Sequence, residues 1–422
     1  MQQSSSWSLV CHLDYGDHGR LSVIRHDGKS ALVTRLERGA ASPQDAAHKP
    51  VFLGVAPDDS VLLMDAESRE ITKQGSFPED AFVPYAYRDT DSRRIWFMND
   101  GDEDTGCDAL NCGDTGSSVM VVNTETVQLH KTICVGRGHH VTVFTRPTEK
   151  TPNIPQRAFV SNLQDGTISV IGNNEKDAAT YLKVISTINL CQPDKEEGGT
   201  LSVPNNAFPH GMEFSPVTGK VYNLNNGYGT ISIIDPVAAS VEAVIPLKKK
   251  SSNLLLSPCG RFLIGKGADR KTDPDHVTGT LSVIDLQKRA VVQTLDLTDV
   301  YPSVYRFSPD GGKLYITTAA TGKGAQHANL KKDRVLVFDA NALPALKLTN
   351  EIKVGNADCG RRPLAFTKLN GARPFVFLPN PTDGTVSIVD AKNNTVVETV
   401  GIGEPNIDEL LFSFWQDGIY GA

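Results

Sequence analysis

Cysteine is scarce in this chain, which has seven among 422 residues. A disulfide scaffold is not required, because a chain of this length buries enough apolar surface to fold without one. Cys107 and Cys112 lie five residues apart in a loop rich in Gly and Asp, where a local disulfide and two free thiols are both compatible with the sequence. A zinc site would need two further ligands close by, which this loop does not supply.

Long apolar runs are also missing. No stretch approaches the roughly 18–20 uninterrupted apolar residues that a membrane-spanning helix needs. The formal net charge is -7 and Lys248–Lys250 is the only basic triplet, so nothing attracts the chain to phosphate backbones or anionic lipids over long range. We therefore expect a small-molecule partner rather than a nucleic acid or a membrane, while the oligomeric state stays open.

The compartment is left open by two observations. The first residues, MQQSSSW, lack the apolar core of a signal peptide. Asn393-Asn394-Thr395 is a glycosylation sequon on an expected hairpin turn. A secreted protein whose signal peptide has been removed and a cytoplasmic protein both agree with the sequence.

The usual catalytic motifs are absent as well. The chain contains no G-x-S-x-G elbow, no H-E-x-x-H, no P-loop and no C-x-x-C-H haem attachment motif. Serine hydrolase, metalloprotease, nucleotide-binding and c-type haem functions lose their usual support. We expect no cofactor.

What the chain does contain is a repeat. The segments 159–172, 221–235, 279–285 and 375–390 share one plan, in which an alternating apolar strand, a turn of Asn, Asp and Gly, and a second alternating strand follow one another. A third strand follows each copy, and a fourth precedes the next copy and often ends in a Ser-Pro turn. Each repeat is therefore expected to form a four-stranded antiparallel meander.

These repeats predict an all-β fold, because no segment of useful length has helical periodicity. One meander cannot bury both of its faces, and radial repetition solves this while leaving few exposed edges. We expect a single domain, 1–422, that forms a β-propeller of seven blades, or of eight if 51–68 forms one. The segment 405–415 matches an innermost strand and the N-terminal repeat lacks one, so the two ends should join in one blade and close the ring.

The motifs SNLQDGTISVI, NNGYGTISIID and DGTVSIVD resemble the repeats of YVTN-type propellers and of the wider quinoprotein amine dehydrogenase-like superfamily. The resemblance covers most of the chain and implies the fold, but such repeats occur in proteins of many functions. At the level of architecture, the chain is also similar to fungal β-propeller hetero-Diels–Alderases of tropolonic sesquiterpene biosynthesis.

Alignment of the repeats predicts a site. The apolar residues before the Ser-Pro turns are Phe144, Phe214, Leu256, Phe307, Phe366 and Phe412, and the residues four positions earlier are His140, His210, Ser252, Ser303, Arg362 and Asp408. Innermost strands line the channel of a propeller, so this register should surround one mouth. We predict His140, His210, Arg362 and Asp408 as catalytic residues at this mouth.

Neighbouring residues are predicted to bind the substrate: His139, Phe208, Ser252, Tyr301, Ser303 and Arg361. A guanidinium group favours an anionic or carbonyl oxygen. The alternative is a wet polar channel whose residues pair with one another, for example Arg362 with Asp408 or Glu409.

Two further features allow two interpretations each. Asp100, Asp102 and Asp104 alternate as calcium ligands often do, but the loop departs from the EF-hand pattern, so a calcium site and a solvated acidic loop remain alternatives, and we expect no metal. The long insertions 173–206 and 264–278 would form lids or mobile excursions.

The favoured function is a cyclase of hetero-Diels–Alder type in secondary-metabolite biosynthesis. A cycloaddition needs its two reacting partners held in position and hydrogen-bond donors to a carbonyl oxygen of the substrate, and it needs no nucleophile. The alternatives are a lactonase or cycloisomerase with a histidine base, a redox propeller with copper or haem, and a non-catalytic scaffold that binds a ligand or a protein.

Overall fold

The computed structural model describes residues 85–89, 93–100, 112, 117–123, 126, 128–138, 140–320, 327–358, 362–366 and 375–401, together with the backbone of the strands within 9–76 and 409–421. No α-helix occurs in this part of the chain, which contains strands and two short 3-10 turns, Pro193–Lys195 and Pro381–Asp383. The described residues thus contain no helix that is long and apolar enough to cross a membrane. The expected all-β composition is confirmed.

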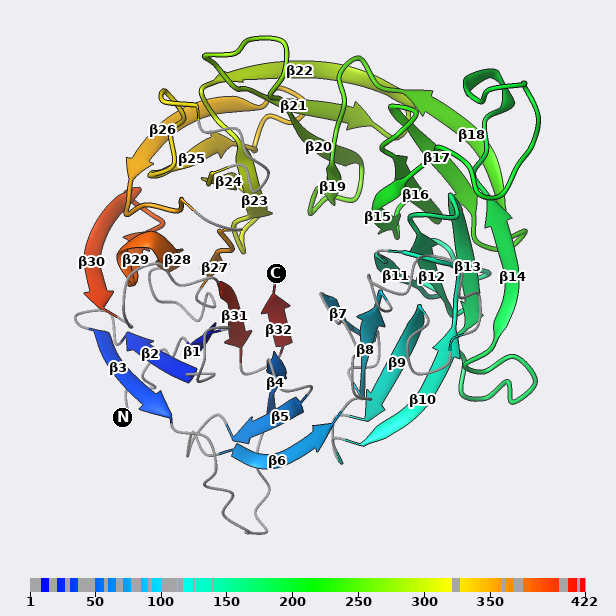
Figure 1. Ribbon diagram of the computed structural model, residues 1–422, viewed down its shortest axis with the longest axis horizontal. Helices are drawn as coiled ribbons and strands as arrows, with labels where there is room; N and C mark the ends of the chain where they lie inside the picture. Colours follow the sequence, from blue (N-terminus) through cyan, green and yellow to red (C-terminus); the bar gives the residue numbers. More distant parts are fainter. Residues whose placement is uncertain are drawn as a thin grey trace. The chain divides into compact units, whose positions relative to one another are not determined.

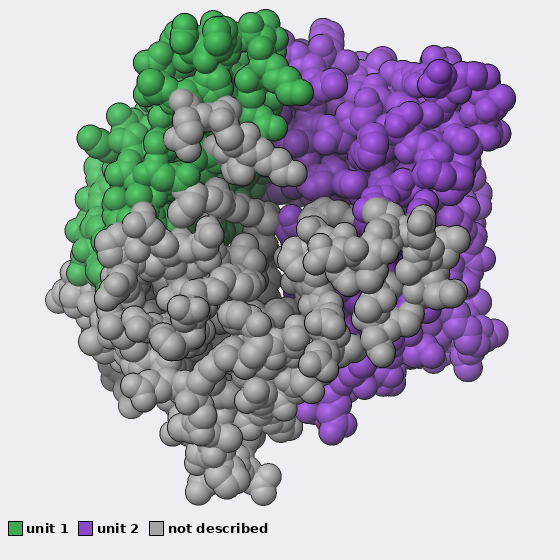
Figure 2. All heavy atoms as spheres, in the orientation of Figure 1, with its two compact units in different colours: residues 1–74, 268–279, 296–422 green, residues 75–267, 280–295 purple. Residues whose placement is uncertain are grey.

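The chain divides into two compact units (Figure 2). One unit comprises 75–267 and 280–295, and the other comprises 1–74, 268–279 and 296–422.

The first of these units, 75–267 with 280–295, is built from four-stranded antiparallel meanders (Figure 1). Their strands are β7 (Tyr85–Arg88), β8 (Arg94–Asn99), β9 (Ser118–Asn123), β10 (Leu129–Cys134), β11 (Thr142–Thr145), β12 (Arg157–Asn162), β13 (Thr167–Gly172), β14 (Val184–Asn189), β15 (Pro209–Ser215), β16 (Lys220–Asn225), β17 (Thr230–Asp235), β18 (Ser240–Pro246), β19 (Asn253–Leu256), β20 (Phe262–Asp269), β21 (Thr278–Asp285) and β22 (Ala290–Thr298).

The other unit contains two more meanders and two further sheets. The meanders are β23 (Pro302–Phe307), β24 (Lys313–Thr318), β25 (Arg334–Asp339) and β26 (Lys347–Lys353), then β27 (Ala365–Phe366), β28 (Phe375–Asn380), β29 (Thr385–Asp390) and β30 (Thr395–Gly401). The segment 51–68, for which the sequence allowed an eighth blade, contributes to a three-stranded sheet. Its strands are β4 (Pro50–Ala56), β5 (Ser60–Asp65) and β6 (Ile71–Ser76).

The two ends of the chain share one sheet, as the sequence predicted. Its order is β3-β2-β1-β31-β32, with β1 (Leu9–Asp14), β2 (Leu21–His26), β3 (Ala31–Leu36), β31 (Glu409–Trp415) and β32 (Gly418–Gly421). The edge strand beyond β1 is β32 rather than the expected segment 405–415, which contains β31. β1 pairs antiparallel with β31 along six residues of each strand. The C-terminal strand therefore completes the N-terminal meander by backbone hydrogen bonds.

The middle strands of each meander are the most buried. All six residues of β13 are buried, whereas the outer strand β14 keeps only Ile188 buried. Middle strands are covered on both faces, which explains their nearly continuous apolar sequence. Apolar clusters fill the space between neighbouring sheets, for example Phe159 and Val170 with Val221 and Ile234.

A repeated asparagine braces the central hairpins. In three meanders the buried side-chain amide at the end of the second strand donates to a Thr and a Ser hydroxyl of the third strand. These sets are Asn162 with Thr167 and Ser169, Asn225 with Thr230 and Ser232, and Asn380 with Thr385 and Ser387. The spacing N-x4-T-x-S is thus a structural signature of the hairpin.

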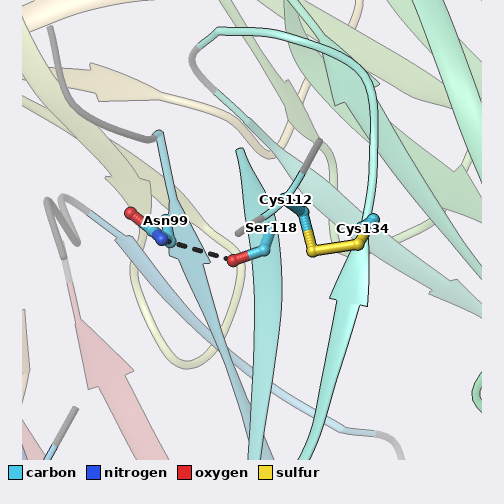
Figure 3. The surroundings of a disulfide bond; sticks show 4 residues. All are labelled: Asn99, Cys112, Ser118 and Cys134. Atoms are coloured by element: carbon cyan, nitrogen blue, oxygen red, sulfur yellow. Dashed lines mark hydrogen bonds between the residues drawn. A yellow bond between two sulfur atoms is a disulfide. The ribbon is translucent and has the colours of Figure 1, made fainter. Parts of the chain in front are cut away.

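The expected disulfide between Cys107 and Cys112 is wrong. Cys112 is bonded to Cys134, and their Cα atoms are 5.1 Å apart (Figure 3). β10 folds back beside β9 and places Cys134 opposite Ser118, close to the segment that carries Cys112. Proximity along the sequence misled the prediction, because strand pairing brings a more distant cysteine closer. Cys107 lies outside the described residues.

The two expected insertions also differ from the structure. Residues 173–206 contain the outer strand β14, which divides them into the connections 173–183 and 190–208. Residues 264–269 and 278 belong to β20 and β21, leaving 270–277 as a connection. The sequence overestimated both loops because each contains strand residues, those of β14 in the first and the ends of β20 and β21 in the second.

Candidate functional site

The predicted site residues lie at one end of their own sheets. In every four-stranded meander, the innermost strand begins at the end that also carries the hairpin between the second and third strands. The connections between β8 and β9, between β14 and β15 and between β24 and β25 all join strand ends at this end. Connections that vary in length on a rigid scaffold are the usual carriers of binding residues.

His140 precedes β11 and is fully buried. Its Nδ1 lies 2.7 Å from the carbonyl oxygen of Ser161 on β12. A carbonyl oxygen only accepts, so Nδ1 carries the proton and Nε2 is the basic atom of the neutral ring. The strand β12 therefore fixes both the tautomer and the orientation of this imidazole.

His210 is held in the same way at the start of β15. Its Nδ1 lies 2.7 Å from the carbonyl oxygen of Ser252, and the Ser252 backbone N–H donates to the carbonyl of Lys266. β15 lies beside β19, the strand that follows Ser252. The structure thus brings together His210 and Ser252, two residues of the predicted register. In the neutral ring of His210, Nε2 is therefore a hydrogen-bond acceptor rather than a donor.

Arg362 is a fully enclosed cation. Its Nη2 donates to the carbonyl oxygens of Lys332 and Gly355 at 2.9 and 2.7 Å, and its backbone N–H donates to the Ser303 hydroxyl at 2.9 Å. The hydroxyl of Thr317 donates to its carbonyl oxygen. Arg362 and Ser303, both in the predicted register, therefore lie in contact within one unit.

Two nitrogens of this guanidinium group, Nε and Nη1, have no hydrogen-bond partner among the described residues. Burial lowers the pKa of Arg362 to about 10, while Asp333, Asp383 and Asp358 act in the opposite direction. A buried cation without a direct counter-charge is costly, which makes this edge of the side chain the strongest candidate for contact with a ligand oxygen.

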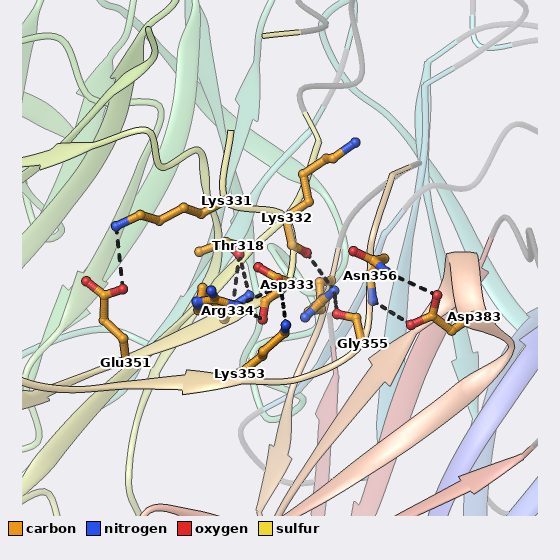
Figure 4. A network of polar contacts seen from close by, with 11 residues as sticks. Thr318, Lys331, Lys332, Asp333, Arg334, Glu351, Lys353, Gly355, Asn356 and Asp383 are labelled. Atoms are coloured by element: carbon orange, nitrogen blue, oxygen red, sulfur yellow. Dashed lines mark hydrogen bonds and ion pairs between the residues drawn. The ribbon is translucent and has the colours of Figure 1, made fainter. Parts of the chain in front are cut away.

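The carboxylates around Arg362 have other partners, and Figure 4 shows those of Asp333 and Asp383. Asp333 pairs with Arg334 at 2.6 Å, and Asp358 pairs with Lys332. Asp383 accepts from the backbone and side chain of Asn356 at 2.8 and 3.3 Å. These contacts hold Asn356 and Asp358, so the described acids stabilise the residues near the arginine rather than neutralise it directly.

Arg137, which lies three residues before His140, has a structural role. Its backbone N–H and its Nε donate to the two carboxylate oxygens of Asp165 at 2.8 and 2.7 Å. Asn356 and Asp383 repeat this arrangement. In both sheets, an aspartate of the central hairpin therefore holds the residue that follows a glycine, Gly136 or Gly355, so Arg137 and Asn356 have structural roles.

Phe208 and Tyr301 are both partly accessible. Phe208 is 41% exposed and has a φ of +44°, a left-handed conformation that is rare for a bulky residue. A Cβ on Gly227 would lie 2.6 Å from the Phe208 ring and 2.0 Å from the carbonyl oxygen of Asn206, so glycine is required there. In the other unit, the Arg270 guanidinium lies 5.7 Å from the centroid of Tyr301.

The connection 190–208 contains contacts that sequence reasoning missed. Tyr228 donates to Glu196, which also accepts from the backbone and side chain of Asn206 at 2.7 and 2.9 Å. Lys195 donates to the carbonyl of Tyr228 at 2.8 Å. The connection is therefore anchored to the β16–β17 hairpin. The sequence did not predict this contact, because Glu196 and Tyr228 are 32 residues apart and belong to no motif.

Part of the prediction is not tested by these contacts. His139, Arg361, Asp408, Asp102 and Asp104 lie outside the described residues, whereas Asp100 is described. His140, His210, Ser252 and Phe208 belong to one unit and Arg362, Ser303 and Tyr301 to the other, so their convergence at one mouth stays a prediction. In the described part of the chain, no group of three or more His, Cys, Asp or Glu could hold a metal ion.

No protein-family model matches the chain, and no curated protein matches it in sequence. Among solved structures, dihydro-heme d1 dehydrogenase NirN in complex with DHE is similar with a TM-score of 0.62 and 14% identity, covering 100% of this chain and 76% of that chain. Hydrazine synthase of Kuenenia stuttgartiensis has a TM-score of 0.54 and 14% identity, covering 84% of this chain and 99% of that one.

A Bacteroides fragilis protein with the provisional name 6-phosphogluconolactonase has a TM-score of 0.55 and 14% identity, covering 98% of this chain and 100% of that one. These likenesses and the repeated antiparallel meanders identify the chain as a β-propeller. None of the three named structures is a cyclase, so the resemblance to hetero-Diels–Alderases stays a prediction.

Proposed function

We propose that this propeller is an enzyme that processes a small organic molecule, and that it is a cyclase of hetero-Diels–Alder type acting on a terpenoid or polyketide carbonyl compound. The observation that supports this is the enclosed guanidinium of Arg362, whose Nε and Nη1 have no partner among the described residues. A preorganised donor in a site without water stabilises charge that grows on a carbonyl oxygen in the transition state.

We propose the following roles for the site residues. Arg362 donates to the carbonyl oxygen of the heterodiene, and Ser303, which accepts from its backbone N–H, positions it. Nη2 is held by two carbonyl oxygens, so the guanidinium plane cannot rotate away. His140 and His210 are proposed to accept a hydrogen bond from a substrate hydroxyl through Nε2, and Phe208 is proposed to supply an apolar wall.

The test is a cycloaddition in the presence of the purified protein, with a carbonyl-bearing heterodiene and an alkene. We expect faster product formation than in buffer and an excess of one enantiomer. Arg362→Lys keeps the charge but loses the fork of donors, and it should lower kcat by about 10²–10³-fold. Arg157→Lys is the matched control, because the Arg157 guanidinium also donates to two carbonyl oxygens, those of Pro236 and Val237.

A lactonase is the second candidate. The observation that favours it is the fixed tautomer of His140 and His210, which presents Nε2 as a base. The B. fragilis neighbour carries a lactonase name, although likeness at this identity concerns the fold. Acid release from δ-gluconolactone that is lost in His210→Gln and kept in Arg362→Lys would favour the lactonase over the cyclase. No turnover in either assay would favour the binding scaffold.

A further inference from the structure

A second pair of polar residues lies away from the predicted register, in the unit that contains Arg362. His276 belongs to the connection 270–277 between β20 and β21, and Asp299 follows β22. The Nδ1 of His276 lies 2.6 Å from the Oδ1 of Asp299. The His276 side chain is 44% exposed and that of Asp299 only 16%, so the carboxylate is covered while the imidazole faces solvent.

The backbone fixes Asp299 in place. Its φ is +58°, a left-handed conformation that aspartate tolerates better than most residues. Its N–H donates to the carbonyl of Val277 at 2.8 Å, and its own carbonyl accepts from the N–H of Lys331 at 2.8 Å. Asp299 therefore joins the connection 270–277 to the segment before β25. Its carboxylate is held in a defined position beside Nδ1 of His276.

The connection that carries His276 is fastened at two further points. The His327 ring donates through Nδ1 to the carbonyl of Pro274 at 2.9 Å, and the Asn329 side chain donates to the carbonyl of Asp275. The Arg270 guanidinium lies over the ring of Tyr301, two residues after Asp299. The imidazole is thus held on an anchored loop at the end of the sheets where the innermost strands begin.

We propose that His276 and Asp299 form a proton-transfer dyad that hydrolyses esters or lactones, with His276 as the catalytic base and Asp299 as its positioning residue. Nε2 of His276 takes a proton from a water molecule, whose oxygen attacks the acyl carbon. The bond from the acyl carbon to the leaving oxygen breaks, and the proton on the imidazolium passes to the leaving group or to solvent. Asp299 holds Nδ1–H and stabilises the imidazolium, as carboxylates do beside catalytic histidines.

The charges around the ring determine the pH at which the dyad is active. The hydrogen bond to Asp299 raises the pKa of His276, and the charges of Asp299, Asp273 and Asp275 act in the same direction. The segment packed against the loop contributes His327 and Lys331, and the loop itself contributes Arg270. The base is the neutral imidazole, so hydrolysis should increase with pH, with a midpoint above 6.5, the ordinary pKa of histidine.

The probe is p-nitrophenyl acetate, with release of p-nitrophenolate by the full-length protein measured against pH. His276→Gln should lower the protein-dependent rate by about 10²-fold. Asparagine, like aspartate, tolerates a positive φ, so Asp299→Asn should keep the backbone conformation. This variant should lower the rate of ester hydrolysis and move the midpoint of the pH profile to lower pH. His130→Gln is the matched control, because that histidine is exposed on β10 in the other unit, and its rate should equal that of the unmodified protein.

The pKa of His276 is also measured directly by NMR titration, which needs no turnover and keeps the test valid if loop 270–277 loosens in a variant. An unchanged rate in His276→Gln, or an unchanged midpoint in Asp299→Asn, would overturn the proposal. The dyad and the cyclase are separable, since His276→Gln should leave cycloaddition unchanged and Arg362→Lys should leave ester hydrolysis unchanged.

Discussion

At the scale of single residues, the buried polar side chains of the described residues differ in how many of their polar atoms have hydrogen-bond partners. The amide of Asn225 is buried and donates to Thr230 at 3.0 Å and to Ser232 at 2.8 Å. His140 and His210 each use Nδ1 for one carbonyl oxygen. Arg362 differs because only one of its three guanidinium nitrogens has a partner among the described residues.

Replacing Asn225 tests the hairpin brace. Asn225→Ala leaves the buried Ser232 hydroxyl without this donor and the buried Asn223 amide without this acceptor, so the free energy of unfolding should fall by about 1–3 kcal/mol. Chemical denaturation measures this loss. Asn226→Ala in the same turn is the control, since that side chain makes no hydrogen bond to a described residue, and it should change stability by less than about 0.5 kcal/mol. Equal losses in the two variants would show that the brace contributes nothing specific.

The sequence predicted which residues share a register but not what each one contacts. The His210 to Ser252 and Ser303 to Arg362 contacts join residues that repeat alignment had placed together. The role of Arg137 was missed, because its partner Asp165 lies in a hairpin turn whose proximity depends on strand pairing. Burial of Arg362 was equally invisible, since a charged residue in a loop sequence is normally exposed.

At the scale of elements, covalent and ionic ties reinforce individual meanders. The Cys112–Cys134 disulfide closes a segment with a sequence separation of 22 and ties the β8–β9 connection to β10. Lys220 on β16 pairs with Asp235 and Glu242, at 2.7 Å each, and so connects β16 with β17 and β18.

Removing the disulfide should weaken one meander. For a loop of this length, Cys112→Ser is expected to lower the free energy of unfolding by about 3 kcal/mol, because the unfolded chain regains conformational entropy. Denaturation of the oxidised protein, compared with Cys112→Ser and with Cys107→Ser, measures the effect. If Cys107→Ser were as destabilising as Cys112→Ser, the pairing of Cys112 with Cys134 would be wrong.

The Lys220 pairs give a stability that depends on pH. Hydrogen bonds from Lys220 hold the pKa values of Asp235 and Glu242 below their ordinary values. A carboxyl group with a depressed pKa stabilises the fold above its unfolded pKa, and this stability is lost as the pH falls through the folded pKa. Lys220→Met should therefore reduce stability at pH 7 and flatten its dependence on pH below about 4.5. An unchanged slope in thermal unfolding measured between pH 3 and pH 7 would contradict this.

At the scale of the whole molecule, the repeats predicted the fold class, because each meander carries its own turn and strand pattern. Pairing of β1 with β31 was predicted from two incomplete repeats at opposite ends of the chain. Loop lengths were predicted less well, since β20 and β21 extend into segments without clear alternation.

Strand pairing between the ends should be a large contributor to stability. Removing 409–422 deletes β31 and leaves the edge of β1 without its partner, so the melting temperature should fall and aggregation should increase. Removing 416–422 deletes only β32 and is the matched control. Calorimetry that shows equal melting temperatures for the two truncations would contradict a stabilising role for the β1–β31 pair.

The central claim is that the free edge of Arg362 binds a substrate oxygen, and a crystal structure with a bound carbonyl ligand tests it most directly. We predict a ligand oxygen about 2.7–3.1 Å from Nε or Nη1, with Nη2 still bound to the carbonyls of Lys332 and Gly355. A carboxylate of Asp408 or Glu409 on those two nitrogens, with the ligand elsewhere, would contradict the account and make Arg362 a structural ion pair.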